Sequence, residues 1–144
     1  VFDQGLGDIF SIRIAGNFAN QDILGSMEFA CNVAGSKLVV VLGHTKCGAL
    51  KGGLDAPQIE GLGMDNLNHL IYHFEPCIHE VIKEGEERSS KNEDLLERLN
   101  VCNIKSTIND IRHQSSTLRN LEKEGKIMIV GANYDVETGV VTWL

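Results

Sequence analysis

The sequence has no long hydrophobic run and no excess of basic charge. Its longest uninterrupted apolar stretch is Leu38 to Leu42, far too short to cross a bilayer, and its first residues show no basic-then-apolar export pattern. Because 13 Lys and Arg stand against 20 Asp and Glu, the net charge is −7, which argues against nucleic acid and anionic membranes as partners. We therefore expect a soluble, cytoplasmic protein with neither partner.

Paired cysteines and a starting methionine are also missing. The four cysteines have no close spacing, and a chain of 144 residues does not need disulfides for stability, so reduced thiols are expected. The chain opens on VFDQGLG, which looks like ordered sequence, and we therefore expect further residues before Val1. The length fits one domain, residues 1–144, incomplete at its N-terminal end.

The first third of the chain has the pattern of a βαβ unit. Asp8 to Ile14 alternates apolar and polar residues and predicts a strand. Asp22 is a candidate N-cap for a helix that ends at Gly35, and Lys37 to Leu42 is a continuously apolar strand. Such a second strand runs parallel to the first and is covered on both faces. The predicted fold class is α/β, with a mostly parallel central sheet flanked by helices.

The remainder predicts helices and then a hairpin. Apolar spacing favours helices over Asp65 to Lys83, broken at Pro76, and then over Glu93 to Asn100 and Val101 to His113. Lys126 to Gly131 reads as another buried strand. The turn DVETG should fold Val140 to Leu144 back as a C-terminal antiparallel strand.

Two potential metal ligands stand where the apolar strand ends, in GHTKCG. His44 and Cys47 are expected on a tight strand-to-helix turn at the carboxyl end of the sheet, where loops such as Ala15 to Asn17 also converge. Neutral imidazole and thiolate are preferred zinc ligands. A reactive thiol is the alternative, since a Cys near a helix N-terminus beside Lys46 can have a lowered pKa.

The flanks of this turn resemble the β-class carbonic anhydrases. Three segments resemble that family: FDQGLGDIFSIRIAGN, DILGSMEFACNVAGSKLVVVLGHTKCGALKGG and LEKEGKIMIVGANYDVETGVV. The resemblance implies a zinc enzyme that interconverts carbon dioxide and bicarbonate and assembles as a homodimer or homotetramer. It also implies that His44 and Cys47 are two of three protein zinc ligands. The substrate-binding candidates are Gln4, Ala15, Gly16, Asn17 and Gly48.

The rest of the family's catalytic group is absent from these residues. The third ligand belongs to a Cys-x-Asp-Ser-Arg motif that precedes FDQG in the family and does not occur here, so no catalytic Asp–Arg pair is identifiable in this chain. Zinc with three protein ligands lowers the pKa of its bound water from about 15.7 to around 7, and the resulting hydroxide attacks carbon dioxide. We therefore expect little activity from residues 1–144 alone, and a sheet that lacks a central strand between Phe10 to Ile14 and Leu38 to Leu42.

Two other classes of function remain open. The first is an interaction module that has the carbonic anhydrase fold without a complete metal site. The second is a redox or regulatory protein that uses Cys47 and does not need zinc. His69 and His73 have helical spacing for a shared metal, but Pro76 interrupts the face that continues to Cys77 and His79. Cys31 and Cys102 are expected as core residues.

Overall fold

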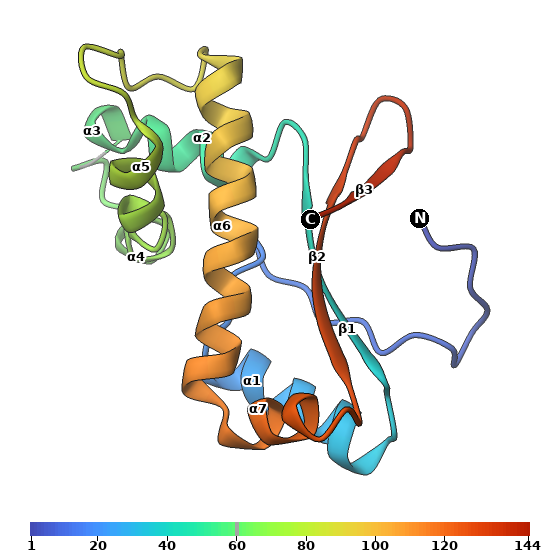
Figure 1. Cartoon of the computed structure of the whole chain (residues 1–144). Coiled ribbons are helices and arrows are strands. Elements are labelled where there is room, and N and C mark those ends of the chain that lie inside the picture. The colour runs from blue at the N-terminus through green and yellow to red at the C-terminus, as the bar shows by residue number, and fades with distance from the viewer. Residues whose placement is uncertain (60) are drawn as a thin grey trace.

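The protein, seen here as a computed structural model, consists of helices packed on one face of a small sheet (Figure 1). The structure describes residues 1–59 and 61–144. Its strands are β1 (Leu38–His44), β2 (Met128–Tyr134) and β3 (Val141–Trp143). Its helices are α1 (Gln21–Glu28), the π-helix η1 (Phe29–Val33), α2 (Gly48–Leu54), α3 (Ala56–Ile59), α4 (Asp65–Tyr72), α5 (Glu75–Val81), α6 (Glu93–Gln114) and α7 (Ser116–Lys123).

The sheet is mixed, with the strand order β1-β2-β3. β1 and β2 run parallel, in register from Leu38 opposite Met128 to His44 opposite Tyr134. β3 returns antiparallel to β2 after the Asp135 to Gly139 turn. A parallel pair needs a long crossover, which the helices α2 to α7 supply. The α/β fold class and the C-terminal antiparallel strand are thus confirmed.

The predicted strand over Asp8 to Ile14 is wrong. Residues 9–14 have no regular structure, and Ile9 and Phe10 are about half exposed. An extended segment becomes a strand only where neighbouring backbone groups pair with it. Within the described residues β1 pairs with β2 alone, so nothing there offers residues 9–14 a ladder on the outer edge of β1.

Local signals set most helix boundaries. Asn20 caps α1, its Oδ1 accepting from Ile23 N at 2.9 Å, so the helix begins before the predicted cap at Asp22. The π-helix ends at Val33, and Gly35 shortly after it has a φ of +83° that turns the chain as predicted. The two helices predicted from Glu93 to His113 form the single helix α6, because no breaker separates them.

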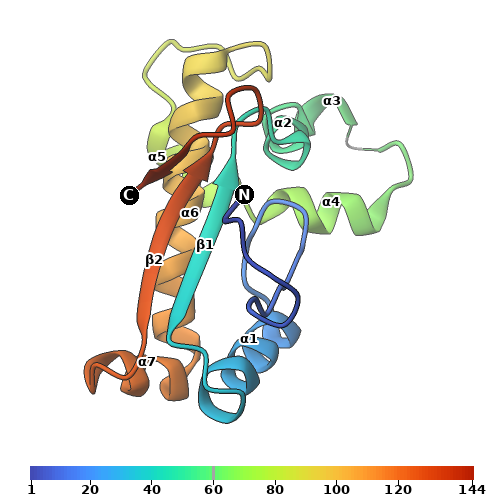
Figure 2. The ribbon, with the colours of Figure 1, turned by 90° about the vertical axis from the view of Figure 1, so that its right-hand side faces the viewer.

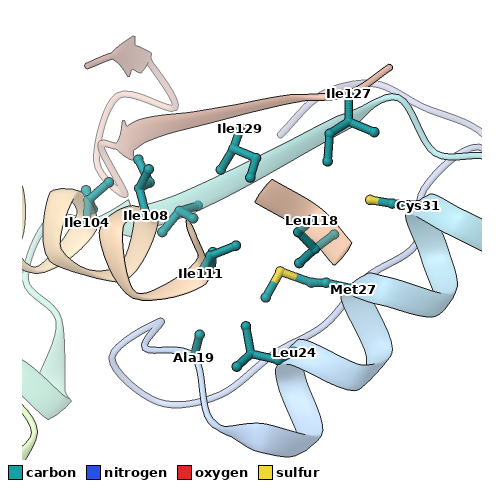
Figure 3. Close-up of a cluster of buried hydrophobic side chains, with 11 residues drawn as sticks. Ala19, Leu24, Met27, Cys31, Ile104, Ile108, Ile111, Leu118, Ile127 and Ile129 are labelled. Atoms are coloured by element: carbon teal, nitrogen blue, oxygen red, sulfur yellow. The ribbon is translucent and has the colours of Figure 1, made fainter. Parts of the chain in front are cut away.

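Helix α6 runs behind β1 and β2 (Figure 2) and contributes to two hydrophobic clusters. The first lies between the sheet, α1, α6 and α7, and its members converge from all four (Figure 3). The second joins α2, α4 and α5 to the first half of α6. The cover predicted for both faces of the sheet is present on one, since Leu38 and Met128 are 50% and 61% exposed.

Two glycines let α6 approach the sheet closely. A Cβ at Gly43 of β1 would lie 2.5 Å from Ile104 Cδ1, and one at Gly131 of β2 would lie 2.7 Å from Ile104 Cγ2. Ile104 is fully buried above both positions.

Among the helices of the described chain, none combines the length and apolar character needed to cross a membrane.

Candidate metal and substrate site

The turn between β1 and α2 brings His44 and Cys47 to the carboxyl end of β1. His44 is the last residue of the strand and is exposed, whereas Cys47 is 4% exposed and immediately precedes α2. Lys46 between them has a φ of +58°, a left-handed conformation that is uncommon outside glycine. The predicted strand-to-helix turn is therefore present, with one candidate ligand on each side of it.

The imidazole of His44 is oriented by the backbone of its own turn. Its Nδ1 lies 2.9 Å from the carbonyl oxygen of Thr45. Since a carbonyl only accepts, this contact assigns the ring hydrogen to Nδ1 and leaves the lone pair on Nε2. A metal-binding histidine commonly donates its other ring N–H to a carbonyl in this way.

The same turn is fastened to the hairpin between β2 and β3. Thr45 N donates to Tyr134 O at 2.9 Å, and Thr45 Oγ1 accepts from Val136 N at 3.0 Å. Lys46 Nζ is paired with Glu137, and the hydrogen bond that it donates to that carboxylate raises the pKa of Lys46. The pair is exposed and adds little stability, so the Thr45 bonds fix the turn.

We predict that acid loosens this hairpin. Asp135 Oδ1 accepts hydrogen bonds from Thr138 N at 3.1 Å and from Glu137 N at 2.8 Å. Both bonds hold the pKa of Asp135 below its usual value, and the bond from Thr138 has the larger effect. Because the folded pKa is depressed, the stabilisation is present above the usual Asp pKa and is lost as pH falls through the lowered value.

An NMR titration of the Asp135 carboxyl carbon measures this effect directly. The Glu137 and Thr138 amide resonances should move with the same midpoint, and Asp135→Asn should remove that transition. A midpoint at or above that of a solvent-exposed aspartate would contradict the prediction.

The loop at Ala15 to Asn17 lies beside the start of α2. Gly16 is buried, and a Cβ built on it would be 3.4 Å from Ala49 Cβ, two residues after Cys47. Gly16 and Asn17 both have positive φ, +77° and +44°. Asn103 of α6 fixes them, donating from Nδ2 to Gly16 O at 2.7 Å and to Asn17 Oδ1 at 3.4 Å. The expected convergence of this loop with the first turn of α2 is therefore observed.

A second buried amide of α6 supports the strand ends. Asn100 is 3% exposed, and its Nδ2 donates to Asn133 Oδ1 of β2 at 2.8 Å. Its Oδ1 would lie 2.5 Å from a Cβ on Gly43, next to His44. Sequence reasoning missed Asn100, Asn103 and Asn133, although Asn100, Asn103 and Thr107 step by three and four residues along one face of the helix. The signal in the sequence was that these polar residues recur at the spacing expected of buried positions on a helix.

Comparison with known proteins decides the family. The family model described as carbonic anhydrase matches residues 1–141. The chain belongs to the carbonic anhydrase family. Carbonic anhydrase 2 of Mycobacterium tuberculosis is 30% identical over 139 residues, which are 96% of this chain and 64% of that protein. The chain thus spans about two thirds of the length of this carbonic anhydrase.

Solved structures assign the β-class. The β-carbonic anhydrase CcaA superposes with a TM-score of 0.82 at 25% identity, over 96% of this chain and 68% of that one. A tetrameric β-carbonic anhydrase of the filamentous ascomycete Sordaria macrospora shares the fold, with a TM-score of 0.80 at 20% identity, over 97% and 70% of the two chains. The resemblance inferred from the sequence is confirmed.

The other substrate candidates lie in different surroundings. Gln4 belongs to the exposed N-terminal coil, which Figure 1 shows apart from α2, and its Nε2 donates to Phe2 O and Asp3 O. Gly48 begins α2, and a Cβ there would meet no atom within 4 Å. Ala15 is exposed beside Gly16. Their substrate roles stay predictions.

The remaining histidine and cysteine candidates lie in different environments. The His73 ring stacks on Phe18 with centroids 4.1 Å apart, and burial, followed by the charge of His69, lowers the pKa of His73. Cys31 is a core residue as predicted, and burial raises its pKa. The expectation of reduced thiols is wrong for Cys77 and Cys102, which form a disulfide. Spacing cannot reveal such a pair, because two helices bring it together.

Proposed function

We propose that the protein to which this chain belongs interconverts carbon dioxide and bicarbonate with zinc held in part by His44 and Cys47. One observation carries the proposal: the His44 to Cys47 turn stands at the carboxyl end of β1 in a chain whose residues 1–141 match the carbonic anhydrase family. Because the chain spans 64% of the Mycobacterium tuberculosis relative, the activity proposed is that of the whole protein.

The donor types suit zinc. His44 Nε2 is free to coordinate because Nδ1 is bonded to Thr45 O, and Cys47 is a free cysteine. Bound zinc would lower the pKa of a water molecule to about 7. Among residues 1–59 and 61–144 no group of three or more His, Cys, Asp or Glu side chains is placed to hold a metal. We therefore assign the third ligand and the Asp–Arg pair to residues outside this chain, without which it has little activity.

One residue of this chain, Asn17, also supports a polar contact to the substrate. The Gly16 loop lies beside the α2 turn, and the buried Asn17 Nδ2 has no hydrogen-bond partner among the described residues. An unpaired buried donor costs about 1–3 kcal/mol, so a donor at this position suits bicarbonate, whose oxygens accept. The bonds from Asn103 fix the orientation of Asn17 and so of this donor.

The proposed assembly is a homodimer or homotetramer in the cytoplasm. The tetrameric Sordaria macrospora enzyme of the same fold supports it. So does the apolar face of the sheet that no helix covers, where Leu38, Met128 and Trp143 are half exposed or more.

Zinc content together with intact mass tests the proposal on the protein purified in its cellular form. We expect a mass above 15.8 kDa and about one zinc per chain, bound with an open position for water. Cys47→Ser should lose the zinc and the hydration of carbon dioxide, because it removes a thiolate ligand. The matched control is Cys31→Ser, which alters the other free buried cysteine and should keep both.

Full zinc content in Cys47→Ser would contradict the assignment of the ligand. A protein of 15.8 kDa without zinc or activity would instead favour the interaction module of carbonic-anhydrase fold, the alternative that retains the structure and lacks the metal.

A further inference from the structure

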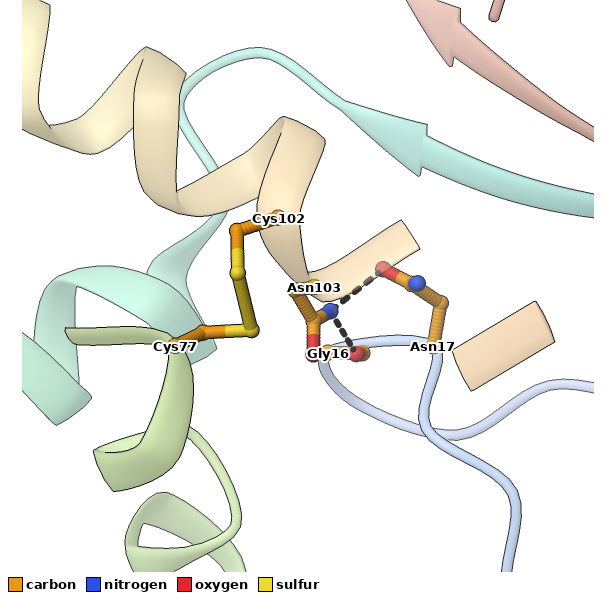
Figure 4. The surroundings of a disulfide bond; sticks show 5 residues. All are labelled: Gly16, Asn17, Cys77, Cys102 and Asn103. Carbon is orange, nitrogen blue, oxygen red and sulfur yellow. Dashed lines mark hydrogen bonds between the residues drawn. A yellow bond between two sulfur atoms is a disulfide. The ribbon is translucent and has the colours of Figure 1, made fainter. Parts of the chain in front are cut away.

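The Cys77–Cys102 disulfide joins two helices that sequence reasoning did not connect. Cys77 lies in α5 and Cys102 near the middle of α6, 25 residues apart, with Cα atoms separated by 5.8 Å (Figure 4). That separation lies within the range usual for a disulfide. Cys77 is 5% exposed, whereas Cys102 is only partly buried, so the Cys102 side is the more open approach to the bond.

Residues next to the two cysteines contact the Gly16 loop. Phe74 precedes α5, one turn before Cys77, and a Cβ on Gly16 would lie 2.2 Å from its Cζ. Asn103, next to Cys102 in α6, donates to Gly16 O and Asn17 Oδ1 (Figure 4). The disulfide therefore links α5, which follows Phe74, to the turn of α6 that carries Asn103.

The loop needs this support because of its backbone. Gly16 and Asn17 are consecutive residues with positive φ, and Asn17 carries a side chain. A left-handed residue other than glycine costs on the order of 1 kcal/mol unless its surroundings stabilise it. Separation of α5 from α6 would weaken the Phe74 contact or the Asn103 bonds that hold the loop in this conformation.

Other contacts keep α5 folded and attached when the disulfide is absent. Near its N-terminus Glu75 forms an ion pair with Arg88, and at its C-terminus Val81 O accepts from Arg98 of α6. Ile78 between them is fully buried in the second hydrophobic cluster. Breaking the disulfide should therefore loosen the Gly16 loop without unfolding α5.

We propose that Cys77 and Cys102 form a reversible redox site for small thiols of the glutathione class, whose disulfide state fixes the Gly16 to Asn17 loop. A thiolate attacks Cys102 Sγ, forming a mixed disulfide and releasing the Cys77 thiolate, which takes up a proton. A second thiolate attacks the sulfur of the bound small molecule and releases Cys102. In total, the protein disulfide and two thiols give two cysteine thiols and one small-molecule disulfide.

Hydrogen exchange across a series of glutathione redox buffers tests the proposal on the intact chain. Between the oxidised and reduced ends of the series, alkylation of Cys77 and Cys102 should rise from none to complete. Exchange of the amides at residues 16–18 should accelerate by at least about tenfold, because the loop opens locally more often. The amides of β2 should keep their rates in the same samples.

A double variant provides the matched control. Cys77→Ser with Cys102→Ser should show the fast loop exchange in every buffer, and Cys31→Ser should respond as the unaltered chain does. Two results would overturn the proposal: loop exchange that is unchanged on reduction, or a cysteine pair that stays in one state throughout the series. Neither readout involves zinc or carbon dioxide, so the result is independent of the proposed function.

Discussion

Replacing Gly16 with alanine is expected to lower the free energy of unfolding by about 3 kcal/mol. The backbone contributes about 1 kcal/mol, because φ is +77° and a Cβ is strained there. Overpacking contributes a further 1–3 kcal/mol or so, since the new methyl would lie 2.2 Å from Phe74 Cζ and 2.7 Å from Cε1. Phe74 is fully buried and has no space into which to move. Urea-induced unfolding measures the change.

A second glycine separates the two contributions. Gly35 has a φ of +83°, and a Cβ there would meet nothing within 4 Å, so Gly35→Ala should show only the backbone cost of about 1 kcal/mol. Adding Phe74→Leu to Gly16→Ala should cost less than Phe74→Leu costs alone. Equal losses at Gly16 and Gly35 would mean that Phe74 does not press on the loop.

Local sequence determines the elements that were predicted correctly. The apolar run into β1, the Gly35 stop and the His44 to Cys47 turn are each encoded within a few residues. The strand predicted over Asp8 to Ile14 is different, because a strand also depends on backbone partners elsewhere in the chain. Its residues alternate as those of a strand do, but no described strand pairs with it.

The parts of the site that could not be predicted come from long-range contacts. Asn103 bonds to a loop 86 and 87 residues away, and Asn100 to a strand 33 residues away. The spacing of residues along a helix indicates which of them are buried, but it does not indicate which loop a buried amide bonds to. The Cys77–Cys102 pair depends in the same way on how α5 packs against α6. How α6 packs against the sheet, the Gly16 loop and α5 decides these three contacts, and local spacing does not specify that packing.

Ile104 is the residue on which that packing depends most, and we expect Ile104→Ala to cost about 3–4 kcal/mol. Its side chain is fully buried above β1 and β2. Removing it forfeits the burial of three carbons and leaves a cavity, a combination that costs roughly 2–5 kcal/mol in tightly packed cores. The lowest values of this range do not apply, because α6 is also anchored by Asn100 and Asn103 and cannot easily collapse onto the sheet. Thermal and urea unfolding of the single variant measure the loss.

A double-mutant cycle with Gly131 shows whether Ile104 acts through close approach. Gly131→Ala alone should cost about 1–3 kcal/mol by overpacking, because its Cβ would lie 2.7 Å from Ile104 Cγ2. In the Ile104→Ala background the same methyl enters the vacated space, so most of that cost should disappear and the two changes should not add. Gly25→Ala in α1 is the control substitution, since a Cβ there meets nothing within 4 Å. Its effect on stability should be the same in the unaltered chain and in Ile104→Ala. Additive costs for Gly131 and Ile104 would mean that Ile104 does not fill the space above the strand. The packing of α6 on the sheet would then depend on its other contacts, such as those of Ile108 and Ile111 and the Asn100 bond to Asn133.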